Sequence, residues 1–173
     1  MGQGNVDRAD PQLRQFFFCL SGNAKRWFSI CFPDHFNFMK EQGVQIDYAG
    51  LSYFPSSNIG GSLTLNQFRA VADNVSKAIA RPIVIPETGY PSTADFQGQF
   101  ANWRVEVPGY PLTPEGQEHW LADLLRMCRS DENIAGAFYW SPEWYGEGMW
   151  KAFALFDVDG NAKPAWKAFN SAK

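Results

Sequence analysis

Short apolar runs alternate with amphipathic helical patterns along this chain. Four runs are rich in β-branched and aromatic residues, and each is followed two residues later by Gly or Pro: residues 15–20, 47–53, 82–87 and 134–140. Helical patterns follow them at residues 33–42, at 65–79, from the cap Thr113 and first-turn Pro114 onward, and at 164–169. This order predicts an α/β protein whose four strand-helix units build a parallel sheet.

Four such units are half of the eight that close a (β/α)8 barrel, which typically takes about 250 residues. The 173 residues therefore predict one unit over 1–173 that resembles half of a TIM barrel, with no separate second domain. Its two edge strands would need a second half-barrel or a missing amino-terminal half as partner. A doubly wound open sheet is the alternative, although no Gly-x-Gly-x-x-Gly follows a strand.

Composition excludes several function classes. The net charge is −3, from 15 basic and 18 acidic residues without a basic block, so we expect no nucleic-acid partner. No apolar stretch is long enough for a membrane span, and the first residues lack the plan of a secretory signal. The three cysteines have no metal-site spacing, and His35 and His119 lack companion ligands. We therefore expect no metal and no cofactor.

Glu87 is the leading candidate for a catalytic residue. It ends the unalternating apolar run 82–87 and is followed by Thr88, Gly89 and Tyr90. A run of this kind is typical of a strand buried on both faces, and in (β/α) barrels the chemistry takes place where such strands end. The alternative is a solvated carboxylate that merely opens a loop.

A family resemblance runs from about residue 12 to the end of the chain. Five motifs carry it, in this order: Gly-Leu-Ser-Tyr-Phe-Pro (50–55), Pro-Glu-Thr-Gly-Tyr-Pro (86–91), Gly-Tyr-Pro-Leu-Thr-Pro-Glu-Gly-Gln (109–117), Phe-Tyr-Trp-Ser-Pro-Glu-Trp (138–144) and Ala-Leu-Phe-Asp (154–157). They resemble the second half of the glycoside hydrolase family 53 endo-β-1,4-galactanases. The resemblance implies a retaining glycosidase on a TIM barrel that degrades β-1,4-galactan and arabinogalactan side chains of pectin, with Glu87 as nucleophile. It also implies a secreted or periplasmic protein.

The same resemblance assigns further positions to substrate binding. Tyr53 resembles a phenol that faces the nucleophile in related barrels, although it could equally be a core residue. Tyr90 lies in the nucleophile motif, and Trp140 and Trp144 are expected to stack on galactose rings, although core positions would also suit them. Ser141 stands where the family usually has Glu, and Glu143 offers a carboxylate two residues later.

The acid/base residue is the missing part. In this family it belongs to an Asn-Glu pair at the end of the fourth strand, which this chain does not contain. A calcium site of bacterial members has only Asp95, Asn102 and Glu106 as counterparts here, too few for calcium. Three readings stay open: a galactanase half that is inactive alone, a β-1,3-glucanase-like relative, and a non-catalytic galactan-binding protein.

Overall fold

The computed structural model describes residues 16–17, 35–57, 64–98, 101–146, 148 and 150–171. Residues 35–41 are helical, and the other elements alternate largely as the sequence predicts. They are β1 (Phe16–Phe17), β2 (Tyr48–Gly50), α2 (Leu65–Ile79), β3 (Ile83–Thr88), α3 (Pro114–Ser130), β4 (Ile134–Tyr139), α4 (Trp150–Phe153), the 3₁₀ helix η1 (Pro164–Lys167) and α5 (Ala168–Ser171).

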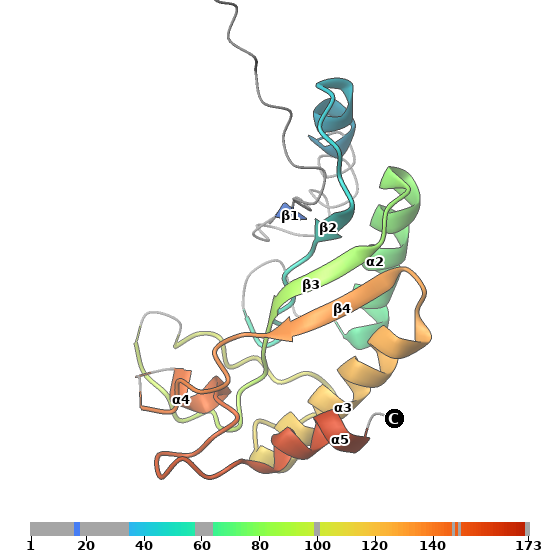
Figure 1. Ribbon diagram of the computed structural model, residues 1–173. Helices are drawn as coiled ribbons and strands as arrows, with labels where there is room; N and C mark the ends of the chain where they lie inside the picture. The colour runs from blue at the N-terminus through green and yellow to red at the C-terminus, as the bar shows by residue number, and fades with distance from the viewer. Residues whose placement is uncertain are drawn as a thin grey trace, which may run out of the picture.

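The four strands form one parallel sheet in the order β1-β2-β3-β4, which confirms the predicted topology. The expected first strand is present as Phe16–Phe17, and the rest of its predicted range lies outside the described residues. The second strand is shorter than expected, and Tyr53 pairs separately with Thr88. In Figure 1 the arrows of β3 and β4 point toward the loops that carry α4.

Helices α2 and α3 cover one face of this sheet (Figure 1). The apolar stripe that predicted α2 is buried there, and α3 contributes its own apolar side chains to the same core. Every second residue of β2 and β3 joins them, as a strand's period of two requires. The buried core includes Ala49, Leu51, Phe68, Ala72, Val75, Ile79, Ile83, Ile85, Trp120, Leu121 and Leu124.

The opposite face of the sheet carries different residues. Ala137 and Tyr139 pack against the helix-side core, so Phe138 between them points the other way and is 61% exposed. In a closed barrel this face is the filled interior. The exposed Phe138 therefore marks an interior position that the described part of the chain does not bury.

Local chemistry explains where the two long helices begin and end. Thr64 caps α2 in a capping box with Gln67, and Thr113 caps α3 by accepting from the N–H of Gly116. Gly116 is required, since a Cβ there would lie 1.8 Å from the carbonyl oxygen of Pro111. Ala80 ends α2 in the left-handed region at φ +53°.

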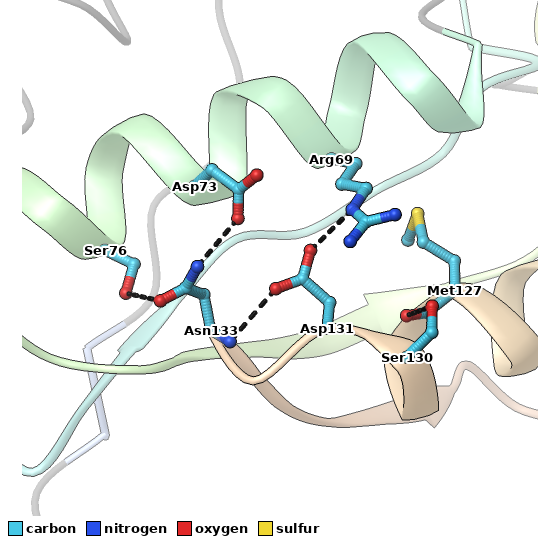
Figure 2. A network of polar contacts seen from close by, with 7 residues as sticks. All are labelled: Arg69, Asp73, Ser76, Met127, Ser130, Asp131 and Asn133. Atoms are coloured by element: carbon cyan, nitrogen blue, oxygen red, sulfur yellow. Dashed lines mark hydrogen bonds and ion pairs between the residues drawn. The ribbon is translucent and has the colours of Figure 1, made fainter.

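A polar network joins α2 to the turn between α3 and β4 (Figure 2). Arg69 Nε donates to Asp131 Oδ2 at 2.7 Å, and the backbone N–H of Asn133 donates to the other oxygen at 3.0 Å. Asn133 also donates to Asp73 at 2.9 Å and accepts from Ser76 at 3.3 Å. This network lies before β4, at the end of the sheet remote from Glu87.

Candidate functional site

Glu87 lies at the carboxyl end of β3 and is half-buried. Its Oε2 accepts a hydrogen bond from Ser52 Oγ at 3.3 Å. Ser52 follows β2, and its neighbours Leu51 and Tyr53 both belong to the helix-side core. Alternation along the strand therefore turns Ser52 to the face opposite the helices, where it meets the carboxylate.

Two backbone hydrogen bonds and one from a side chain hold three distant segments together around Glu87. The N–H of Tyr53 donates to the carbonyl of Glu87 at 2.9 Å, and the hydroxyl of Thr88 donates to the carbonyl of Tyr53 at 2.6 Å. The N–H of Trp140 donates to the carbonyl of Thr88 at 2.8 Å. The ends of β2, β3 and β4 thus meet at one edge of the sheet, as expected for a barrel site.

The position of Tyr53 corrects the expectation that its phenol faces the nucleophile. Its side chain is buried on the helix side, where the ring stacks on Phe68 with centroids 4.2 Å apart. Burial raises the pKa of the phenol well above its usual range. Tyr53 therefore takes the core position that the sequence left open as its alternative, and Ser52 supplies a hydroxyl to the Glu87 carboxylate. The alternating pattern Leu51-Ser52-Tyr53, with a polar residue between two apolar ones, was the signal in the sequence.

Tyr90 is a second correction, because it is fully buried and so is not a substrate contact in this structure. Its ring stacks on Trp120, with centroids 5.2 Å apart. Its hydroxyl donates to the carbonyl of Tyr110 at 2.5 Å and accepts from the N–H of Val107 at 3.0 Å. Burial raises its pKa to about 12. Tyr90 therefore anchors the loop that leads into α3.

Three tryptophans gather in the segment that follows the carboxyl end of β4. The ring centroids of Trp140, Trp144 and Trp150 lie 6.1 to 6.4 Å apart in edge and tilted arrangements. Trp144 is 42% exposed, whereas the indole Nε1 of Trp140 is buried and finds no acceptor among the described residues. The sequence predicted Trp140 and Trp144 for this site but missed Trp150, which begins α4 and comes close only through folding.

The loop after β4 also carries Glu143. Its side chain is exposed. Ser141, directly after Trp140, adopts φ +46°, a left-handed conformation that is unusual for a residue with a side chain. The backbone thus turns sharply where the aromatic loop leaves the sheet.

Gln117 is a further residue that the sequence did not single out. It is fully buried in α3, and its Nε2 donates to the carbonyls of Tyr90 at 2.7 Å and Phe153 at 3.1 Å. The hydroxyl of Tyr139 donates to the same carbonyl of Phe153 at 2.7 Å. These two side chains tie the segment after Glu87 and α4 to the helix layer.

The part of the chain described by the structure contains no cluster of three or more His, Cys, Asp or Glu able to hold a metal ion. His35 and His119 are exposed on their helices. Cys128 is buried, which raises its pKa to about 11. Among the described helices, none combines the length and the apolar content of a membrane span.

Comparison with known proteins adds an independent result. The family model for glycosyl hydrolase family 53 matches residues 28–169. The arabinogalactan endo-beta-1,4-galactanase of Cellvibrio japonicus (strain Ueda107) is 31% identical over 148 residues, which cover 76% of this chain and 38% of that protein. The protein of the same name from Thermothelomyces thermophilus is 28% identical over 111 residues, 62% of this chain and 32% of that one.

Solved structures agree on the fold. The Ignisphaera aggregans GH53 catalytic domain superposes with a TM-score of 0.69 at 23% identity, covering 88% of this chain and 45% of that one. The strands and helices described above are thus part of a TIM-barrel architecture. The chain spans less than half of the length of the proteins that it matches.

Proposed function

Because this chain belongs to glycosyl hydrolase family 53, we propose that residues 1–173 supply the carboxyl-terminal half, strands 5 to 8, of a retaining endo-β-1,4-galactanase. Glu87 is its nucleophile. The observation that carries the proposal is the half-buried Glu87 carboxylate at the carboxyl end of β3, hydrogen-bonded by Ser52, with the backbone of Trp140 bonded to the following residue, Thr88. A retaining glycosidase needs a carboxylate of this kind.

The reaction assigns one role to Glu87. Its carboxylate attacks the anomeric carbon of a galactose residue, and the glycosidic oxygen leaves with a proton from a second carboxyl group. Water then releases the sugar from the glycosyl-enzyme while that second group takes the proton back. The two carboxyl groups stand about 5 to 5.5 Å apart in retaining enzymes. We assign the second group to an Asn-Glu pair on the half of the barrel that precedes this chain.

Two features support an incomplete site in this chain. Phe138 is exposed on the sheet face that a closed barrel fills, and the buried Nε1 of Trp140 lacks an acceptor among the described residues. An unsatisfied buried donor costs roughly 1–3 kcal/mol. A complementary half-barrel would supply both the missing packing and polar partners, so we expect this chain alone to be inactive.

The aromatic cluster is assigned to substrate binding. Sugar rings present C–H faces that pack on aromatic planes, and the 42% exposed Trp144 offers such a plane within a short reach of Trp140. Glu143, exposed on the same loop, is assigned to sugar hydroxyls at the rim. Tyr53 and Tyr90 are left out of this assignment because they are buried on the helix side.

The test of the nucleophile uses a substrate that needs no proton donor. The chain, joined to its upstream half, is incubated with a 2-deoxy-2-fluoro-β-galactoside that carries a dinitrophenolate leaving group, and the adduct is mapped by mass spectrometry. We expect the adduct on Glu87 and none in Glu87→Gln. An adduct on Glu143 instead, or on no carboxylate of this chain, would overturn the assignment.

Polymer substrates separate the remaining readings. We expect the complete protein to hydrolyse β-1,4-galactan, and Glu87→Gln to remove at least 99.9% of that activity, about the scale of loss for a catalytic group. Cleavage of a β-1,3-glucan with no action on galactan would favour the glucanase-like reading. Galactan binding that persists in Glu87→Gln, without hydrolysis by either protein, would favour a non-catalytic binding protein.

A further inference from the structure

Helix α4 is too short to satisfy its own backbone groups. The N–H of Ala154 donates to the carbonyl of Trp150 at 2.7 Å, as a helix requires. The next N–H, that of Leu155, donates to the carbonyl of Pro142 at 2.7 Å instead, so the carbonyl of Lys151 loses its helical partner. Carbonyls at the end of a helix then need partners from outside it. Side chains from other segments provide them here.

Four side chains, each from a different segment, donate to the last three carbonyls of α4: Lys163 to Lys151 at 2.8 Å, Ser92 to Ala152 at 2.9 Å, and both Gln117 and Tyr139 to Phe153, at 3.1 Å and 2.7 Å. The helix also packs on an apolar cluster, in which the ring of Phe153 meets Phe96 and Trp103 edge-on. Apolar packing has no direction, whereas a hydrogen bond does. The donors therefore fix how α4 lies on this cluster.

Gln117 joins two of these segments through a single amide. Its Nε2 lies 2.7 Å from the carbonyl oxygen of Tyr90, three residues after Glu87, and 3.1 Å from that of Phe153 at the end of α4. An amide nitrogen carries two hydrogens, enough for both carbonyls. The side chain is fully buried and this nitrogen faces oxygen atoms, so the group that occupies the position must be a donor. One planar amide thus sets the spacing between the segment after Glu87 and α4.

The position of α4 decides where the ring of Trp150 lies, because Trp150 is the first residue of this helix. Its centroid is 6.3 Å from that of Trp140 and 6.1 Å from that of Trp144. Trp140 is held separately, by the hydrogen bond from its N–H to the carbonyl of Thr88. A displacement of α4 would therefore move Trp150 away from the other two rings of the cluster.

We propose that Gln117 is a positioning residue for galactan binding and that it acts through Trp150. The inference rests on the proposed function, which assigns the tryptophan cluster to sugar rings. Gln117 is fully buried, so it does not contact the sugar itself. Its amide holds the end of α4 against the segment after Glu87 and keeps Trp150 in the cluster before the substrate arrives. A surface arranged in advance binds without the cost of ordering its side chains.

The position of Trp150 can be measured without any substrate. The complete protein is labelled with 5-fluorotryptophan, and the ¹⁹F resonance that disappears in Trp150→Phe is assigned to Trp150. Gln117→Met keeps the length of the side chain but removes both donors, so we expect it to shift or broaden this resonance. The matched control is Ile79→Val, which removes one carbon atom from the buried face of α2 and should leave the resonance unchanged.

Kinetics test whether this position serves binding. We expect Gln117→Met to raise KM for β-1,4-galactan about fivefold and to change kcat by less than about twofold, the pattern of lost ground-state binding. Gln117→Glu keeps the shape of the side chain, but an ionised carboxylate cannot donate, whereas a protonated one can. Burial raises the pKa of such a carboxyl group. The KM of this variant, relative to the unsubstituted protein, should therefore recover as pH falls from about 8 to about 5.

The two measurements fail independently. An unmoved Trp150 resonance in Gln117→Met leaves the galactanase assignment standing, and failure of that assignment leaves the ¹⁹F measurement valid. The positioning role would be overturned by that unmoved resonance or by an equal shift in Ile79→Val. A fall in kcat with unchanged KM, or a relative KM of Gln117→Glu that does not vary with pH, would also overturn it.

Discussion

Ser52 and Glu87 are 35 residues apart in sequence, yet the hydroxyl of Ser52 lies 3.3 Å from Oε2 of Glu87. They meet because β2 and β3 are parallel neighbours, so their carboxyl ends lie at the same edge of the sheet. A donor in this position restricts the rotation of the carboxylate. In a site where the nucleophile must approach one carbon atom, such orientation contributes to the rate.

Ser52→Ala tests this relationship in the complete protein. A hydrogen bond to a charged group contributes about 1.5–3 kcal/mol, and 3.3 Å places this one at the weak end. We therefore expect kcat on galactan to fall about tenfold with little change in KM. Ser76→Ala is the control, because Ser76 makes a hydrogen bond of the same 3.3 Å to Asn133 at the remote end of the sheet. Equal kcat losses in both variants would show a general loss of stability instead.

Tyr139→Phe tests the ties between the segment after Glu87 and α4. The phenol donates to the carbonyl of Phe153 at 2.7 Å, and the amide of Gln117 donates to the phenol at 3.2 Å. Removing it leaves buried polar groups less well satisfied, so we expect the free energy of unfolding to fall by about 1–3 kcal/mol. Urea denaturation of the chain measures this change. Tyr145→Phe, a partly exposed tyrosine of the same region, should stay within about 0.5 kcal/mol.

The sequence alone predicted the elements whose signals are local. The apolar spacing from Leu65 to Ile79 and the Thr113-Pro114 start matched α2 and α3, because amphipathic periodicity and capping depend on a few neighbouring residues. The apolar run before Glu87 matched β3 for the same reason, since a strand buried among helices needs no alternation.

The direction in which single side chains point was harder to predict. Tyr53 was assigned to the nucleophile through a family resemblance, and its packing against Phe68 shows the opposite direction. Gln117 and Trp150 were missed because a Gln within a helix and a Trp at the start of a short helix have no local mark of burial or of a shared site. Their positions depend on contacts between segments far apart in sequence, such as that of Gln117 with Phe153.

Ala80→Gly is a stability prediction that follows from backbone geometry. Ala80 ends α2 at φ +53°, where a Cβ costs roughly 1–2 kcal/mol that glycine avoids. We expect the free energy of unfolding to rise by about 1 kcal/mol, measured by urea denaturation. Ala70→Gly is the matched control, since Ala70 is exposed in the middle of the same helix and should instead lose about 1 kcal/mol. A loss of stability in both variants would contradict the left-handed cap.

Alkaline pH should unfold the chain through its buried tyrosines. Burial raises the pKa of Tyr90 to about 12 from an ordinary value of 10, and the pKa of Tyr110 is also raised to about 12. Between pH 10 and 12 the unfolded chain therefore releases protons that the folded chain keeps. Stability from these groups is fully present below pH 10 and is lost as pH rises toward 12. Burial lowers the pKa of Lys163 to about 8. This shift has the opposite effect, because it makes stability rise with pH, and it acts mainly below pH 10.5.

The measurement is the free energy of unfolding at several pH values from 10 to 12. Each tyrosine whose pKa is raised in the folded chain lowers the free energy of unfolding by up to about 1.4 kcal/mol per pH unit in this range. Tyr90→Phe should lower stability at pH 8, because the hydrogen bonds with Tyr110 and Val107 are lost. The same variant should nevertheless show a shallower decline above pH 10, by about 1.4 kcal/mol per pH unit, since its buried ring no longer carries a proton. An unchanged slope would mean that the Tyr90 phenol ionises as easily in the folded chain as in the unfolded one.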